Sequence, residues 1–153
     1  MTTVAFKDGI MAGDTRGHDG DVGIVSIPKV FKKKIKNKEV IFGVAGYWEA
    51  ALMFMDWYAS RDAALMERLM KLRGDDDFDV IIWDGKKLLN ADALMYPVEL
   101  TESYYAIGSG AAYAITAMDC GKSAIQAVQM AMKRDSGTGG RIVQMSLTSK
   151  EVK

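Results

Sequence analysis

The chain of 153 residues has a length typical of one domain with a single hydrophobic core. Its 20 basic and 20 acidic residues cancel, so charge gives no argument for nucleic-acid binding, and 49% hydrophobic content is ordinary for a globular protein. A single cysteine, Cys120, excludes an internal disulfide and a multi-cysteine zinc site. No membrane-length apolar run or signal-peptide pattern is present, so we expect a cytoplasmic protein with one domain over residues 1–153.

Short apolar runs separated by turn signals predict strands in the first 46 residues. The step Asp8-Gly9 predicts a tight β-hairpin, whereas the polar, glycine-rich stretch 15–21 predicts a loop. The lysine-rich stretch 32–38 is interpreted as a solvated hairpin tip, with contact to an acidic partner or a nucleic-acid backbone as the alternative. The expected strands span residues 2–6, 10–13, 23–27 and 40–45, the last two forming a pair.

From Tyr47 onward, apolar residues recur first at helical spacing and then in alternating strand and helix patterns. Ser60 is expected to cap the second helix and Gly74 to end it, with the aspartates 75–77 in a loop. After these two helices we expect strands at 78–83, 88–89 and 104–107, helices at 111–119 and 122–133, and a strand at 141–147. Two helix pairs separated by strands predict an α+β fold with antiparallel sheets between two helical layers.

Thr2 carries a nucleophile and a base on one residue if Met1 is removed, which the small second side chain permits. An α-amine with a pKa of about 7.7–8.0 is roughly 10–20% unprotonated at pH 7, whereas an ordinary lysine is less than about 0.1% unprotonated. The amine could therefore take the proton of the Thr2 hydroxyl. By itself, however, a threonine in second position is usually just a processed terminus.

Six short motifs follow one another along the chain. They are Thr2-Thr3-Val4, Ala12-Gly13-Asp14, Lys29-Val30, Gly43-Val44-Ala45-Gly46, Ala106-Ile107-Gly108-Ser109-Gly110 and Arg134-Asp135-Ser136-Gly137-Thr138-Gly139-Gly140. Each alone has an ordinary structural interpretation, such as a turn, a surface lysine or a helix cap. Together and in this order they resemble the β-type subunits of the proteasome, including the simpler bacterial HslV peptidase, from Thr2 to about Leu147.

The resemblance implies a four-layer α/β/β/α sandwich of the N-terminal-nucleophile hydrolase type, with Thr2 as the nucleophile. Lys29 matches the catalytic lysine of the family, and Asp14 matches the aspartate that orients this lysine. The lysine's positive charge would lower the pKa of the threonine system. Gly46 matches the glycine whose backbone N–H stabilises the oxyanion of the tetrahedral intermediate.

The same resemblance assigns supporting roles to residues far along the chain. Ser109, Asp135 and Thr138 match the serine, aspartate and serine around the α-amine, and Thr138 keeps a hydroxyl where the family has serine. Val44 matches the floor of the pocket for the substrate side chain that precedes the scissile bond. Its medium apolar side chain favours apolar substrate side chains.

The resemblance therefore implies a threonine endopeptidase enclosed in a ring-shaped homo-oligomer, acting on unfolded polypeptides or peptides without a metal or organic cofactor. An ATP-dependent unfoldase is the implied partner, since this sequence has no phosphate-binding loop of its own. Two alternatives remain open: a catalytically silent ring-forming subunit that retains Met1, and an amidohydrolase of small molecules on the same fold. His18 is expected to be exposed in a loop, and Cys120 to be a small packed side chain.

Overall fold

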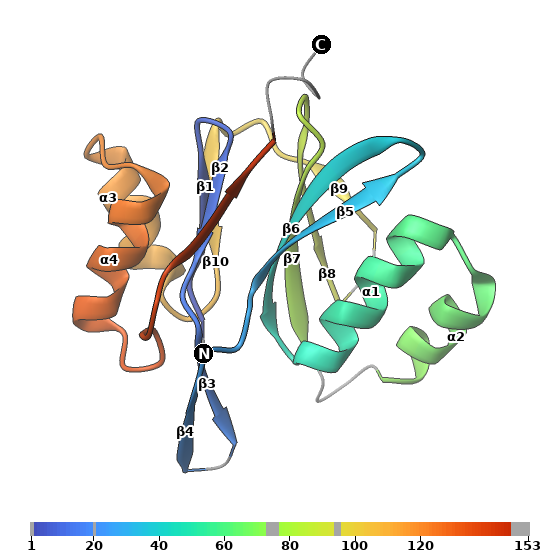
Figure 1. The fold of residues 1–153 in the computed structure, drawn as a ribbon, viewed down its shortest axis with the longest axis horizontal. Coiled ribbons are helices and arrows are strands. Elements are labelled where there is room, and N and C mark those ends of the chain that lie inside the picture. The colour runs from blue at the N-terminus through green and yellow to red at the C-terminus, as the bar shows by residue number, and fades with distance from the viewer. Residues whose placement is uncertain (1, 20, 73–76, 94–95, 148–153) are drawn as a thin grey trace.

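The computed structural model describes the chain except residues 1, 20, 73–76, 94–95 and 148–153. Two β-sheets lie face to face, and a pair of helices covers each outer face, giving four layers (Figure 1). The strands are β1 (Val4–Lys7), β2 (Ile10–Gly13), β3 (Arg16–Asp19), β4 (Val22–Val25), β5 (Val30–Ile35), β6 (Lys38–Gly46), β7 (Phe78–Trp83), β8 (Leu88–Asp92), β9 (Val98–Glu99), β10 (Tyr104–Ile107) and β11 (Val143–Ser146). The helices are α1 (Trp48–Ser60), α2 (Ala63–Lys71), α3 (Ala111–Asp119) and α4 (Ala124–Arg134).

Both large sheets are antiparallel throughout. The order β10-β1-β2-β11 joins the two ends of the chain in one four-stranded sheet, and the other sheet is the meander β5-β6-β7-β8-β9. The β1–β2 hairpin turns through Asp8 and Gly9, both with positive φ, as the Asp-Gly step predicts. The short β3–β4 hairpin extends from one end of the sandwich (Figure 1).

Three apolar clusters hold the layers together, one at each interface. The side chains of β6 alternate: Phe42 and Val44 pack in the cluster beneath α1 and α2, while Ile41 and Ala45 pack between the sheets. The third cluster, between the four-stranded sheet and α3 and α4, is rich in alanine on both sides. The predicted order of layers is therefore confirmed, because each outer sheet face is sealed by one helix pair.

Two predictions in the first half of the chain are wrong, and that of a hairpin tip over the lysine-rich stretch holds only for its turn at Lys36 and Asn37. The stretch 15–21 is not a loop but contains β3, and β4 pairs with β3 rather than with β6. Most of the lysine-rich stretch forms β5, which pairs with β6 from Val30 to Ile35. Alternation explains the error, because Lys32 and Lys34 are exposed while Phe31 and Ile35, on the other face of the strand, pack in part against the cluster beneath α1 and α2.

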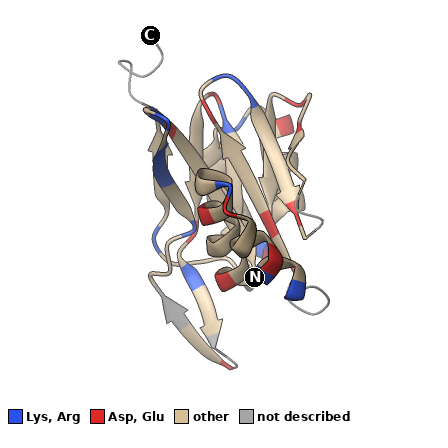
Figure 2. Ribbon diagram, turned by 90° about the vertical axis from the view of Figure 1, so that its right-hand side faces the viewer, with Lys and Arg blue, Asp and Glu red and all other residues tan. Residues whose placement is uncertain are grey.

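Local details also differ at the helix ends and the basic stretch. Ser60 ends α1 instead of capping α2; the cap is Asp62, whose side chain accepts from the N–H of Ala64. Gly74 and the first two of the three aspartates lie outside the described residues. Two lysines of the basic stretch form ion pairs, with Glu39 and Asp56, and Figure 2 shows basic and acidic segments interspersed around α1 and α2.

Candidate active site

The site lies at one end of the sandwich, where several strands begin or end. Since neighbouring strands are antiparallel, the start of β1 lies beside the end of β2 and the end of β10, and the start of β11 lies beside the end of β2. The start of β5 and the end of β6 meet in the facing sheet. All eight residues predicted for the site lie in these terminal segments or in the connections directly before or after them.

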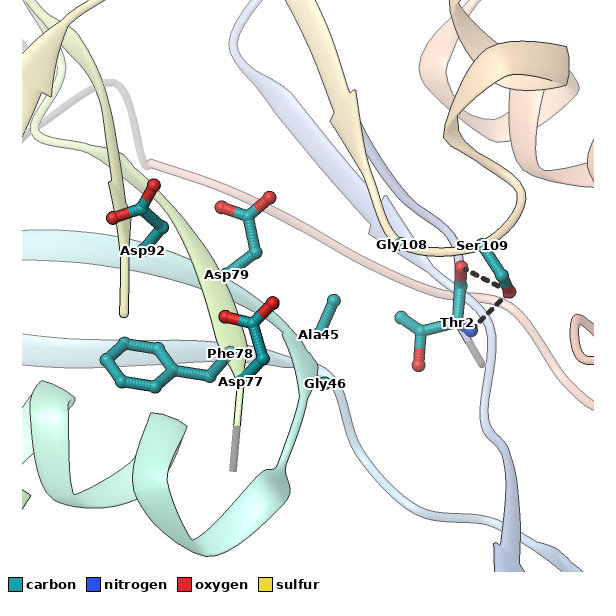
Figure 3. A pocket seen from close by; sticks show the side chains of 9 residues that line it. All are labelled: Thr2, Ala45, Gly46, Asp77, Phe78, Asp79, Asp92, Gly108 and Ser109. Carbon is teal, nitrogen blue, oxygen red and sulfur yellow. Dashed lines mark hydrogen bonds between the residues drawn. The ribbon is translucent and has the colours of Figure 1, made fainter. Parts of the chain in front are cut away.

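Thr2 is buried just before β1, next to the loop between β10 and α3. Its backbone nitrogen donates to Ser109 Oγ at 3.0 Å (Figure 3), and its carbonyl oxygen accepts from the Gly110 N–H at 3.1 Å. Gly108 has a positive φ, and a Cβ there would lie 2.1 Å from the Thr2 carbonyl oxygen. A glycine is therefore required for this close approach. Met1 lies outside the described residues.

Lys29 and Asp14 form a buried ion pair that joins the two sheets. Lys29 Nζ lies 2.9 Å from Asp14 Oδ1, with 5% and 0% of the two side chains exposed. Asp14 also accepts backbone N–H bonds from Thr3 at 3.0 Å, Arg16 at 3.2 Å and Gly139 at 3.0 Å. Burial lowers the pKa of Lys29 below that of a free lysine, although the hydrogen bond and charge of Asp14 offset part of the shift.

A second polar group lies on the other side of the Thr2 backbone, and we call Ser109, Asp135 and Thr138 the carboxylate–hydroxyl cluster. Asp135 Oδ2 accepts from Ser109 Oγ at 2.6 Å and from Thr138 Oγ1. Burial raises the pKa of Asp135, but these bonds and the Gly137 N–H together outweigh it, so the pKa lies below its usual value. The carboxylate is therefore ionised at neutral pH.

Gly46 ends β6 opposite Thr2 and has a φ of 87°. A Cβ at this position would lie 2.5 Å from the carbonyl oxygen of Asp77, which accepts the N–H of Tyr47 at 2.7 Å. Only a residue without a side chain fits this backbone without displacing the start of β7. The structure thus fixes the position of the Gly46 backbone next to Thr2.

Two cavities meet at Thr2, Ala45 and Gly46. The larger, about 740 Å³, extends past Lys29, His18 and Trp48 and has Val44 in its wall, although Val44 is only 1% exposed. His18 thus lies in β3 beside this cavity rather than in an exposed loop, and Cys120 is exposed rather than packed. Both predictions were wrong because the residues next to His18 and Cys120 in the sequence do not indicate how the fold buries or exposes these side chains.

The smaller cavity, about 370 Å³, has an acidic wall. It is lined by Asp77, Asp79 and Asp92 on the side opposite Thr2 (Figure 3). Burial raises the pKa of Asp79, the Asn90 side chain that donates to it acts in the opposite direction, and the charge of Asp92 adds to the rise. Within the described part of the chain, no three His, Cys, Asp or Glu side chains converge to hold a metal ion.

Sequence reasoning missed several groups that complete the site. Thr3 and the backbone nitrogens of Arg16 and Gly139 bind Asp14, and Asp79 and Asp92 shape the smaller cavity. Thr3 lies in a motif that the sequence analysis quoted, but its tertiary hydrogen bonds have no local signal. The acidic wall forms because Asp79 and Asp92 are directly paired across β7 and β8.

No family model matches this sequence, and no curated protein matches it significantly. Solved structures do match over nearly its whole length. BPH from Thiobacillus denitrificans in complex with epoxomicin shares 20% identity with a TM-score of 0.67, covering 96% of this chain and 98% of its own. A second structure of that BPH shares 20% identity with a TM-score of 0.67, and the match covers 97% of this chain and 98% of the other. Eukaryotic HslV from Trypanosoma brucei shares 18% identity with a TM-score of 0.66, and the match covers 94% of this chain and 97% of the other.

The chain therefore has the fold of HslV. The predicted four-layer α/β/β/α sandwich of the N-terminal-nucleophile hydrolase type is confirmed. At these identities the likeness shows the fold, and the chemistry has to be argued from the residues of this site. None of the described helices combines the length and apolar character needed to span a membrane.

Proposed function

We propose that the chain is a threonine peptidase of the proteasome and HslV type, with Thr2 as the nucleophile after removal of Met1. The observation that carries this proposal is the convergence at Thr2 of a buried ion pair and a partly exposed polar cluster. The nitrogen of Thr2 donates a hydrogen bond to Ser109 of the carboxylate–hydroxyl cluster, and Thr2 and Lys29 line the same cavity. A nucleophile, a base and a buried cation are the parts that acyl transfer needs.

The reaction begins when Thr2 Oγ attacks the peptide carbonyl and its proton passes to the α-amine. The charge of Lys29 favours the unprotonated amine at neutral pH, so a larger fraction of it is available to accept the proton. The C–N bond then breaks, and the departing amine takes the proton from the α-ammonium group. An ester to Thr2 Oγ remains; water attacks it with the amine again as base, and breaking the ester C–O bond returns the proton to Oγ.

The tetrahedral intermediates place negative charge on the former carbonyl oxygen. In this proposal the backbone N–H of Gly46 donates to that oxygen, and losing such a donor typically costs about 3 kcal/mol of transition-state stabilisation. The fixed position of Gly46 opposite Thr2 supports this role. Val44, in the wall of the larger cavity, forms the floor that selects apolar side chains before the scissile bond.

The family resemblance extends the proposal to assembly. The active form is a homo-oligomeric ring in the cytoplasm whose subunits enclose the active sites. It accepts unfolded polypeptides and peptides and works with a separate ATP-dependent unfoldase. The proposed mechanism uses no metal or organic cofactor, because the amine and hydroxyl of Thr2 account for every proton transfer.

Intact-mass measurement before and after treatment with epoxomicin tests nucleophile and processing together. The wild type should have lost Met1 and should gain the mass of one inhibitor molecule per chain. Thr2→Ala should gain none, while Thr101→Ala, which alters an exposed threonine, should behave as the wild type. Cleavage of fluorogenic peptides and unfolded casein should follow the same pattern.

Each alternative function gives a different result. Uniform retention of Met1 with no inhibitor adduct would indicate a silent ring-forming subunit. An adduct at Thr2 with no cleavage of peptides or casein would favour hydrolysis of small-molecule amides. Peptide cleavage that survives in Thr2→Ala would refute the assigned nucleophile.

A further inference from the structure

The carboxylate–hydroxyl cluster has a defined direction of hydrogen bonding. Asp135 is ionised and can only accept, so the hydroxyls of Ser109 and Thr138 must both donate to it. Each hydroxyl has one hydrogen, and that of Ser109 goes to Asp135 at 2.6 Å rather than to the Thr2 carbonyl oxygen, which lies 3.4 Å from Ser109 Oγ. Ser109 Oγ is consequently an acceptor toward the Thr2 nitrogen, 3.0 Å away, as proton abstraction by a free amine requires.

The same reasoning fixes the role of Thr3. Thr3 Oγ1 lies 2.7 Å from Thr138 Oγ1, and both side chains are buried. Because the hydrogen of Thr138 goes to Asp135, Thr3 must be the donor in this bond. A chain of hydrogen bonds therefore runs from Thr3 through Thr138 to Asp135, which also accepts from Ser109.

Thr3 is held in place by its backbone and by the neighbouring helix start. Its N–H donates to Asp14 Oδ1 at 3.0 Å, and its carbonyl oxygen accepts from the Asp14 N–H at 3.1 Å. A Cβ on Gly110 would lie 1.9 Å from Thr3 Oγ1 and 3.0 Å from Thr138 Oγ1. Gly110 thus leaves room for the two hydroxyls to meet, and Thr3 contacts both polar systems of the site.

We propose that Thr3 is a positioning residue of the peptidase site, whose hydroxyl orients Thr138 and Asp135 so that Ser109 accepts from the Thr2 amine. This role rests on the proposed function. An amine that donates one hydrogen to Ser109 keeps its lone pair free to point at its own Oγ, from which the proton comes. Thr3 itself touches no substrate; it acts through the cluster.

Two variants separate the contribution of the hydroxyl from that of the rest of the side chain. Thr3→Val removes the hydroxyl and keeps the branched shape, whereas Thr3→Ser keeps the hydroxyl and is the rescue variant. Losing the bond should lower kcat of Thr3→Val about tenfold, the effect of one buried hydrogen bond, with KM within about twofold. Thr3→Ser should recover most of the lost kcat. If Thr3→Val does not fold, Thr3→Ala supplies a second hydroxyl deletion.

The pKa of Asp135, measured by carbon NMR of the carboxyl group in a Thr2→Ala background, gives a readout that needs no activity. It should rise in Thr3→Val and stay near the parent value in Thr3→Ser. Lys29, whose charge interacts with that of Asp135, is unchanged in all of these proteins.

The two readouts distinguish failure of this role from failure of the proposed function. Undiminished kcat in Thr3→Val, or an equal loss in both variants, overturns the positioning role while leaving Thr2 as nucleophile. If the wild type has no Thr2-dependent activity, the proposed function fails. In that case an unchanged Asp135 pKa in Thr3→Val also overturns the hydrogen-bond chain, and a raised one supports it.

Discussion

Replacing Lys29 by methionine tests how strongly the buried ion pair joins the two sheets. Asp14 follows β2 in the four-stranded sheet, and Lys29 precedes β5 in the facing sheet. Methionine matches the length of the lysine stem but removes the ammonium group. The carboxylate of Asp14 then stays fully buried with three backbone N–H donors and no counter-charge.

The size of the effect follows from that environment. Breaking a buried ion pair by removing one partner costs about 3–5 kcal/mol. Because three N–H bonds to Asp14 remain, we expect Lys29→Met to lower the free energy of unfolding by about 3 kcal/mol, the lower end of that range. With a urea dependence of roughly 2 kcal/mol per molar, the unfolding midpoint should fall by about 1.5 M.

Urea titration followed by circular dichroism measures this shift, and a double-mutant cycle tests its origin. Adding Asp14→Asn to Lys29→Met removes the uncompensated charge while keeping an amide oxygen for the N–H groups of Arg16 and Gly139, which both donate to Oδ2. The double variant should therefore be less destabilised than the sum of the two single variants by about 1–3 kcal/mol. A midpoint for Lys29→Met within about 0.3 M of the wild type (~0.6 kcal/mol), or strict additivity in the cycle, would refute the reasoning.

Three further substitutions test other parts of the site. Burial raises the pKa of Asp79, so ionisation of its carboxyl group opposes folding as pH rises. Asp79→Asn, which can still accept from Asn90, should therefore have a higher Tm than the wild type at pH 7, and the difference should vanish below about pH 4. An equal gain in Tm at both pH values would exclude this cause. Gly46→Ala should lose at least about 2 kcal/mol of stability, whereas Gly9→Ala, also at positive φ but in open space, should lose about 1 kcal/mol; equal losses would argue against the backbone clash. Ser109→Ala should reduce peptide turnover at least about tenfold, and unchanged turnover would remove the Ser109 oxygen from the mechanism.

How far the sequence predicts the structure depends on whether a signal is local. The hairpin at Asp8, the helix from Ala111 to Asp119 and the strand from Phe78 to Trp83 were predicted at or near their observed bounds, because turn residues and apolar periodicity are local. The strand β5 was missed because its lysines conceal an apolar face, Phe31 and Ile35, that packs in the cluster beneath α1 and α2. Pairing partners likewise depend on which strand is available in the fold, and periodicity carries no such information.

The same distinction applies to the site. The motifs placed Thr2, Asp14 and Lys29 on the chain, but the contact between Thr2 and Ser109 spans 107 residues and exists only because β1 pairs with β10. In that pairing Val4 lies opposite Ile107, which puts the residues before β1 level with those after β10.

The register of these strands is what converts separate motifs into one site. Val4 lies opposite both Ile107 and Gly13, so the residues that precede β1 meet the loops that follow β10 and β2. A slip of one residue between β1 and β10 would turn Val4 and Phe6 out of the core between the sheets, and it would also separate Thr2 from Ser109. The apolar alternation of β1 therefore stabilises the fold and aligns the site through the same side chains.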